Sequence, residues 1–370
     1  MSPELIRPVI LRSPRRRELR QEFNERPLVV IWEMTQACDL KCAHCRANAQ
    51  PNRAALELSV AEGYHLIDQV AEMGVPIFVL TGGDPLKRPD LFAQIKYAVS
   101  KGLKPCLTPS ATPLLTREAV RKLKEAGLAR LALSLDGSTP QLHDGTRGVA
   151  GSWAKTIETA KWASEVHLPL QINTTISRRN AHDLEAMAQL LAEQKVVQWS
   201  LFFLVPVGRG QAADLLTPEE HEEVFARMWE LSQRMPFRIK TTEAPHYRRF
   251  VLQKKAEAAG PGTLPEMLAS AQSGFGDGKG FMFVSHVGQV FPSGFLPLPA
   301  GNVLWEGLAA IYRKSSLFMA LRDPDQLKGK CGVCEFREIC GGSRARAYAF
   351  NGDPLSSDPC CSYNPPGTVN

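Results

Sequence analysis

Short runs with strand propensity alternate with amphipathic helical stretches through the first two thirds of the chain. We expect strands, in chain order, at Leu28–Trp32, Ile77–Leu80, Pro105–Thr108, Ala129–Leu135, Leu168–Thr175 and Val197–Leu204. This alternation implies parallel strands joined by right-handed crossovers. Such units form either a doubly wound sheet or an open portion of a (β/α) barrel. In both folds functional residues gather at the carboxyl ends of the strands.

Two capping boxes mark where helices begin. Ser59 and Glu62 precede one apolar-periodic stretch, and Thr217 and Glu220 precede another that should run to about Arg234. In each pair the side chains can satisfy backbone N–H groups that the first helical turn leaves free. The sequence therefore predicts helices directly after Ser59 and Thr217.

The alternation stops after Gly210. Residues 258–280 are rich in Gly, Ala and Ser and predict a flexible connection, after which Phe281–Val284 and Gln289–Phe291 predict a hairpin. The tail from Gly329 onward is rich in cysteine and in loop-forming residues. A region this small would be stabilised by a bound metal.

The composition is that of an ordinary globular protein, with 44% hydrophobic and 22% charged residues. It excludes a disordered, a collagen-like and a coiled-coil chain. The net charge of +6 is mild for this length, and the densest basic run, Arg12–Arg20, predicts a solvated arm instead of a nucleic-acid-binding module. We recognise no signal sequence and no apolar stretch long enough to span a membrane, so we expect a cytoplasmic protein without a nucleic-acid or membrane partner.

The chain has nine cysteines, an odd number that excludes a complete disulfide framework. Eight of them fall into two groups, Cys38, Cys42 and Cys45 near the start and Cys331, Cys334, Cys340, Cys360 and Cys361 near the end. In a reducing compartment, clustered cysteines indicate metal or redox chemistry. The ninth, Cys106, lies in a strand-like run and is expected to be a buried structural thiol.

The first cysteine group directly follows the first expected strand. Cys38, Cys42 and Cys45 are separated by three and by two residues. Thiolates select iron–sulfur clusters or zinc, and three of them on one tight loop can hold three corners of a cubane cluster while leaving the fourth iron open. The alternative is a zinc site with His44 as the fourth ligand, which would require this ring to bend back toward the same metal.

This C-x3-C-x2-C motif after a first strand resembles the signature of the radical S-adenosylmethionine (SAM) superfamily, and the resemblance extends over almost the whole chain. It implies a [4Fe–4S] cluster that binds SAM and a 5′-deoxyadenosyl radical that abstracts hydrogen from substrate. It also implies an α/β fold with a partial (β/α)6 TIM-type barrel and a small, loop-rich α+β cluster domain. The expected division is 1–26 basic arm, 27–215 barrel, 216–280 helical bridge and connection, and 281–370 auxiliary-cluster domain.

Further matches to the superfamily follow in chain order. Gly82, Gly83 and Asp84 end the second strand and resemble its Gly-Gly-Glu motif, with Asp in place of Glu. Two glycines allow the backbone to approach a ligand closely. The resemblance implies further SAM contacts at positions near the ends of later strands, namely Ser134, Arg147, Asn173 and Val207, with Ser110 as a weaker match. A structural salt bridge is the alternative role for Arg147.

The second cysteine group resembles the auxiliary-cluster extension called SPASM, or its shorter twitch form. Cys331, Cys334 and Cys340 would bind a second [4Fe–4S] cluster, with Cys361 as the fourth ligand and Cys360 as the alternative. The larger form carries further cysteines that are missing here, which favours one auxiliary cluster, hence two clusters in all. A structural zinc site is the alternative, because spacing alone does not exclude it.

Two groups of radical SAM enzymes share this layout. One removes or shortens the propionate side chains of tetrapyrroles in heme synthesis and maturation, and the other matures ribosomally made peptides. We expect an oxidoreductase that oxidises or decarboxylates a tetrapyrrole, with the auxiliary cluster accepting an electron and a flavodoxin or ferredoxin as donor. Arg209, Arg248 and Arg249 are candidate propionate anchors. The alternatives are a peptide maturase, although the segment before Leu28 is short for a leader-binding module, and a non-enzymatic zinc scaffold.

Overall fold

The computed structural model describes residues 22–366, and the basic run Arg12–Arg20 lies outside them. All ten strands belong to one sheet, in the order β10-β9-β8-β1-β2-β3-β4-β5-β6-β7. The strands from β8 through β1 to β7 pair in parallel. Strand β9 pairs antiparallel with both of its neighbours, β8 and β10. The α/β class with a barrel-type parallel sheet is therefore confirmed.

The first six strands, β1 to β6, lie where the sequence predicts strands. Their bounds are β1 Val29–Glu33, β2 Ile77–Thr81, β3 Pro105–Leu107, β4 Arg130–Ser134, β5 Leu170–Ile176, β6 Gln198–Phe203, β7 Arg238–Thr242, β8 Phe281–Val284, β9 Gln289–Phe291 and β10 Gly301–Asn302. The predicted hairpin is β8–β9. β7 was not predicted, because it is short and partly exposed and lacks the apolar run of the inner strands.

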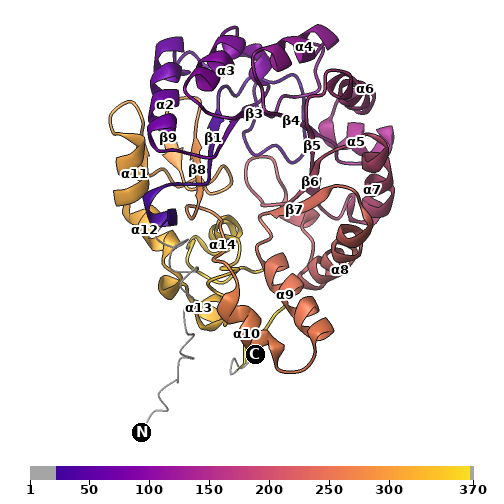
Figure 1. Ribbon diagram of the computed structural model, residues 1–370, viewed down its shortest axis with the longest axis vertical. Helices are drawn as coiled ribbons and strands as arrows, with labels where there is room; N and C mark the ends of the chain where they lie inside the picture. The colour runs from indigo at the N-terminus through magenta and orange to yellow at the C-terminus, as the bar shows by residue number, and fades with distance from the viewer. Residues whose placement is uncertain (1–21, 367–370) are drawn as a thin grey trace.

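Helices cover the outer face of the curved sheet (Figure 1). Those around the six predicted strands are α2 Val60–Glu72, α3 Leu91–Ser100, α4 Arg117–Glu125, α5 Pro140–Arg147, α6 Ser152–Glu165, α7 Leu184–Glu193 and α8 Pro218–Arg234. The later ones are α9 His246–Ala259, α10 Thr263–Ser270, α11 Leu308–Lys314, α12 Ser316–Arg322, α13 Gly329–Val333 and α14 Arg344–Asn351. Both predicted capping boxes form, Ser59 with Glu62 on α2 and Thr217 with Glu220 on α8.

The sheet continues beyond the six expected strands on both sides. β7 pairs with β6, and β8 pairs with β1, so segments expected in the bridge and in the auxiliary-cluster domain extend the barrel sheet itself. The segment 258–280 contains helix α10, which corrects its interpretation as a plain connection, because Gly262 leads into a helical turn. The domain boundaries stay a prediction.

The barrel is left open between β7 and β8, and α14 begins in this gap (Figure 1). Glu243, directly after β7, is hydrogen-bonded to Ser343, the residue that caps α14. Asp277, shortly before β8, accepts from the backbone N–H of Ala345 at 2.9 Å. Two acids from opposite sides of the gap thus contact the amino end of one helix, Glu243 through the Ser343 hydroxyl and Asp277 through a backbone N–H that the first helical turn leaves free.

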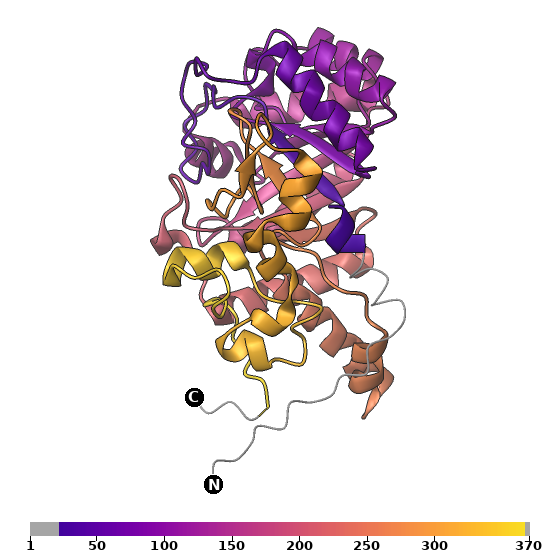
Figure 2. The same ribbon diagram turned by 90° about the vertical axis from the view of Figure 1, so that its left-hand side faces the viewer.

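The cysteine-rich tail is attached through a buried ion pair. Arg346 of α14 donates to Asp358 from Nε at 3.0 Å and from Nη2 at 2.9 Å, and both side chains are fully buried. Although burial opposes ionisation, the guanidinium holds the pKa of Asp358 far below its ordinary value. Figure 2 shows the C-terminal segment gathered beside one end of the barrel. No helix within residues 22–366 combines the length and apolarity needed to cross a bilayer.

Replacing Arg346 with methionine should destabilise the protein strongly. The change leaves Asp358 as a buried charge without its partner, and breaking such a pair costs about 3–5 kcal/mol. Urea unfolding should show this loss, whereas Arg121→Met, which breaks only exposed ion pairs on α4, should leave the free energy of unfolding almost unchanged. Equal effects of the two substitutions would contradict the structural role of the buried pair.

Candidate active site and auxiliary metal centre

The first cysteine loop leaves β1 and lies against the loops that follow the neighbouring strands. Cys38 and Cys42 are each 8% exposed and pack with Leu40, while Cys45 is half-buried. Cys38 Sγ lies 3.2 Å from Ser110 Oγ, and Ser110 Oγ donates to Gly83 O at 2.8 Å. Ser110 therefore connects the cysteine loop with the glycine motif. This contact gives Ser110 a structural role that its weak match to the superfamily did not indicate.

The glycines after β2 allow two backbones to meet. Gly83 N donates to Thr35 O at 2.7 Å, and Asp84 N donates to Ala37 O at 2.6 Å. A Cβ atom on Gly83 would lie 2.4 Å from Ala37 O, a separation that real side chains do not show. The Gly-Gly pair is thus required by the cysteine loop itself, independently of any ligand.

The Asp84 carboxylate is buried and bound by protein groups. Oδ1 accepts from Leu86 N at 3.2 Å and from Ser110 N at 3.4 Å, and Oδ2 accepts from Thr112 Oγ1 at 2.7 Å. Burial raises the pKa of Asp84 despite these donors. In this structure Asp84 ties the β2 and β3 loops together, and a contact with SAM stays a prediction.

Arg147, at the end of α5, lies directly beside the cysteine loop. Its Nη1 is 3.5 Å from Cys42 Sγ, and its Nη2 is 2.7 Å from Oδ2 of the buried Asp136. Both alternatives named for Arg147 therefore have a basis in the structure: a buried salt bridge and a position at the expected cofactor site. Asp136, which the sequence analysis did not single out, directly follows the end of β4 and orients this guanidinium.

His44 faces Asp136, with Nε2 3.7 Å from Asp136 Oδ2. Burial lowers the pKa of His44 to about 4, opposed by Asp136 and assisted by Arg147. The neutral ring therefore faces this carboxylate at a distance longer than a hydrogen bond.

The loop after β6 closes the site from the other side. Arg209 N donates to Cys45 O at 2.9 Å, and Arg209 Nε donates to Cys42 O at 2.9 Å. Gly208 has φ +60°, and a Cβ there would lie 2.4 Å from Cys45 O. Val207, an expected SAM contact, is held by this loop next to the cysteines.

Ser134 and Asn173 are register partners on β4 and β5, so the two expected SAM contacts stand side by side at neighbouring strand positions. Asn173 Oδ1 accepts from Gln171 Nε2 at 2.7 Å. Within residues 22–366, neither side chain hydrogen-bonds to the cysteine loop. Both positions stay predictions.

The donor set around the first three sulfurs fits an iron–sulfur cluster. Leu40 N lies 3.4 Å from Cys38 Sγ, and Ala49 N lies 3.5 Å from Cys45 Sγ, while Arg147 approaches the sulfur of Cys42. N–H groups directed at thiolates are the interactions that stabilise such clusters. Across residues 22–366, no three His, Cys, Asp or Glu side chains converge tightly enough to bind a single metal ion. A zinc ion would need them within ~2.3 Å of one point.

The second cysteine group lines a hollow that is partly open to solvent. Its wall contains Cys331, Cys334, Cys340 and Cys361, together with Arg249, Lys330, Phe336, Arg337, Gly341, Gly342, Tyr363 and Pro365. Gly342 N donates to Cys340 Sγ at 3.3 Å, and Arg344 Nη2 lies 3.8 Å from Cys331 Sγ. Four sulfurs around one hollow, with donors directed at two of them, fit a fully protein-ligated cluster.

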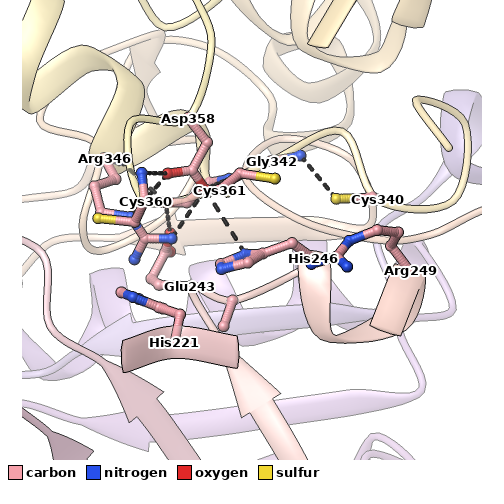
Figure 3. A network of polar contacts seen from close by, with 12 residues as sticks. His221, Glu243, His246, Arg249, Cys340, Gly342, Arg346, Asp358, Cys360 and Cys361 are labelled. Carbon is pink, nitrogen blue, oxygen red and sulfur yellow. Dashed lines mark hydrogen bonds and ion pairs between the residues drawn. The ribbon is translucent and has the colours of Figure 1, made fainter. Parts of the chain in front are cut away.

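Cys360 lies apart from this hollow. Its sulfur is 4.0 Å from Leu216 O. Asp358 Oδ1 accepts from Cys360 N at 3.1 Å, and Figure 3 shows the side chains of Cys360 and Cys361 on opposite sides of Asp358. Burial raises the pKa of Cys360 and of Cys361 to about 11 in each case. The placement supports Cys361 over Cys360 as the fourth ligand.

A buried polar network, not foreseen from the sequence, connects the barrel with this second centre. Figure 3 shows His221, Glu243 and His246 next to Arg346 and Asp358. His246 Nδ1 lies 3.9 Å from Asp358 Oδ2, and the rings of His221 and His246 are 5.2 Å apart. Glu243 has a φ of +58°, unusual for a residue other than glycine, and burial together with Asp277 raises its pKa well above the ordinary value.

The segment Glu243–Arg248, directly after β7, is dense in titratable side chains and packs against distant parts of the chain. Its residues Glu243 and His246 are buried against the C-terminal tail, while Arg248 donates to Phe275 O at 2.8 Å and Ile339 O at 3.3 Å. That density was the signal available in the sequence. The sequence did not show the partners in the C-terminal tail, Ser343 for Glu243 and Asp358 for His246.

Comparison with known proteins agrees with this geometry. The sequence model of the Radical SAM superfamily matches residues 32–191. An AdoMet-dependent heme synthase of Methanosarcina barkeri is 40% identical over 340 residues, covering 92% of this chain and 97% of that protein. A PqqA peptide cyclase of Bradyrhizobium diazoefficiens is 30% identical over 356 residues, covering 92% of this chain and 87% of that protein.

Among solved structures, SuiB of Streptococcus suis bound to its precursor peptide SuiA superimposes with a TM-score of 0.73 at 17% identity, covering 93% of this chain and 78% of that one. This similarity supports the fold alone. Together, the open parallel barrel, the three-cysteine loop and these relatives define a radical SAM enzyme. The chain belongs to the radical SAM superfamily, and membership implies one [4Fe–4S] cluster and SAM as cofactors.

Replacing Gly83 with alanine should disrupt the first centre. The new Cβ would collide with the backbone at Ala37, which precedes Cys38, so we expect at least a tenfold weaker binding of SAM and a reduced iron content of the reconstituted protein. Gly145→Ala on α5 is the matched control, since its Cβ would meet no atom within 4 Å. Calorimetric titration with SAM that gives the same affinity for both variants would refute the packing argument.

The two candidate fourth ligands can be separated by iron analysis. Two cubane clusters would give about eight irons per chain. Cys361→Ser should reduce this to about four, whereas Cys360→Ser should leave it unchanged, because only Cys361 lines the hollow of the other three cysteines. The reverse result would assign Cys360, and one zinc ion per chain in place of iron would exclude an auxiliary cluster.

Proposed function

We propose that this enzyme oxidatively decarboxylates propionate side chains of an iron-bound tetrapyrrole, as a heme-forming synthase does. The observation that carries the proposal is the 40% identity to an AdoMet-dependent heme synthase, which extends over nearly the full length of both chains. The similarity covers 92% of this chain, so it extends well beyond residues 32–191 that match the superfamily model.

The chemistry requires one hydrogen atom and one electron to be removed for each propionate. When bound, SAM and its cluster supply a 5′-deoxyadenosyl radical that takes a hydrogen atom from the carbon β to the carboxylate. The bond to the carboxylate carbon then breaks, CO2 leaves, a vinyl double bond forms and one electron is released. The four-cysteine hollow offers a place for the acceptor of this electron, because a fully protein-ligated cluster suits electron transfer.

Residues of this chain are placed to bind SAM and a carboxylate-bearing substrate. Arg147, beside Cys42, can pair with the SAM carboxylate through its guanidinium fork. Of the three candidate propionate anchors, Arg209 lies next to the cysteine loop, and its buried Nη2 has no hydrogen-bond partner within residues 22–366. Arg248 and Arg249 lie instead toward the second cysteine group, which makes Arg209 the anchor to test.

The test is anaerobic turnover of the reconstituted enzyme with SAM, a strong reductant and iron coproporphyrin III, which carries propionates where heme carries vinyl groups. We expect heme and 5′-deoxyadenosine, both detected by mass spectrometry, and neither from a variant in which alanine replaces Cys38, Cys42 and Cys45. Cleavage of SAM without any change in the tetrapyrrole would contradict the proposal. It would direct attention to peptide substrates, which the PqqA peptide cyclase among the relatives represents.

A further inference from the structure

The charged side chains in the wall of the second hollow are all cationic. Among residues 22–366, this wall contains Arg249, Lys330 and Arg337 and no carboxylate. Acids stand behind this wall: Glu222 pairs with Arg249, and Asp325 pairs with Arg337 at 3.3 Å. Glu335 binds the hydroxyl of Tyr363, and Asp358 lies near Cys361. A cluster held by four thiolates is an anion, and it becomes more negative when it accepts an electron.

Arg249 is the cation best shielded from water. Its side chain is 6% exposed, compared with 12% for Arg337, so its charge acts through a medium of low dielectric constant. Figure 3 shows Arg249 on α9 near Cys340, beside the loop that carries Cys361. Its guanidinium lies over the ring of Tyr363, 5.3 Å from the centroid, and Tyr363 also lines the hollow.

Two ends of the Arg249 guanidinium have protein partners. Nη1 donates to Gln253 Oε1 at 2.7 Å, and Nη2 binds Glu222. The third donor, Nε–H, is buried and has no acceptor within residues 22–366. Buried donors rarely lack a partner, and the sulfurs of a cluster in the adjacent hollow would be available acceptors.

We infer that Arg249 tunes the auxiliary cluster, raising its reduction potential by placing a buried positive charge at the wall of the four-cysteine hollow. The inference rests on the proposed function in treating that cluster as the electron acceptor. In this role Arg249 acts through the cluster, so it is a positioning residue and not a catalytic one. Its ion pair with Glu222 sets how much of the charge the cluster experiences.

The experiment is an EPR-monitored redox titration of the reconstituted full-length protein without substrate. The chain with alanine at Cys38, Cys42 and Cys45 identifies the auxiliary signal. Arg249→Met should favour the oxidised form roughly tenfold, a fall in midpoint potential of about 59 mV for one electron. Arg249→Lys keeps the charge and should restore most of the potential. Lys254→Met removes an exposed charge from the same helix and should leave the potential unchanged.

A change of opposite sign provides the sharpest test. Glu222→Gln removes the acid that partly neutralises Arg249, so the midpoint potential should rise. If Arg249→Met retained its irons and titrated at the wild-type potential, the inference would be overturned. If that variant failed to assemble the cluster, Lys330→Met would take its place, with a lowered potential expected and an unchanged one counting against the inference.

Because no substrate is present, the titration separates this inference from the proposed function. A lowered potential in Arg249→Met, together with no heme formation by the wild type, would support the tuning role while refuting the tetrapyrrole substrate. Heme formation by the wild type, together with an unchanged potential in Arg249→Met, would do the reverse.

Discussion

Asp358 accepts hydrogen bonds from the backbone next to Cys340 and next to Cys361. It also forms a buried ion pair with Arg346 of helix α14, which begins in the barrel gap. Oδ2 accepts from Ser343 N at 2.8 Å, and Oδ1 accepts from Cys360 N at 3.1 Å, while Arg346 binds both oxygens. A charge this deeply buried is tolerated only when it is paired and hydrogen-bonded. The relative positions of Cys340 and Cys361 therefore depend on this one carboxylate.

The catalytic side of the molecule depends on close backbone contact instead of buried charge. The cysteine loop packs against Gly83 on one side and Gly208 on the other, at separations that leave no space for a Cβ atom. Each contact is reinforced by backbone hydrogen bonds, from Gly83 N to Thr35 O and from Arg209 N to Cys45 O. A loop fixed by neighbouring strand ends can hold its three thiolates in a defined geometry before any cofactor binds.

The two centres differ in their electrostatic surroundings. Beside the first, the positive charge of Arg147 is balanced by Asp136, which is itself fully buried. Around the second, the charged side chains that line the hollow within residues 22–366 are all cationic. Helix α14 begins on a network shared by both sides of the open barrel, so the segment with the second cysteine group and the barrel form one continuous structure.

Much of the fold followed from local sequence. The first six strands, the β8–β9 hairpin and both capping boxes depend on interactions within a few residues, such as Ser59 with Glu62, and were predicted. The motif residues Cys38, Cys42, Cys45, Gly82 and Gly83 could be recognised because their spacing matches the motifs of the radical SAM superfamily. The membership in the radical SAM superfamily and the enzymatic nature of the chain follow from them and are confirmed.

Only the tertiary structure decided how distant residues pair. The pairing of β8 with β1, the contact of Glu243 with Ser343 and the separation of Cys360 from Cys361 join positions whose relation no local pattern encodes. The roles of Asp136 and Arg249 also could not be predicted from local sequence, because the effect of a charge depends on its burial and on the partners that it meets in the folded chain. The sequence by itself determined which chemical groups are present and in which elements they lie, and the packing of those elements determined which groups meet.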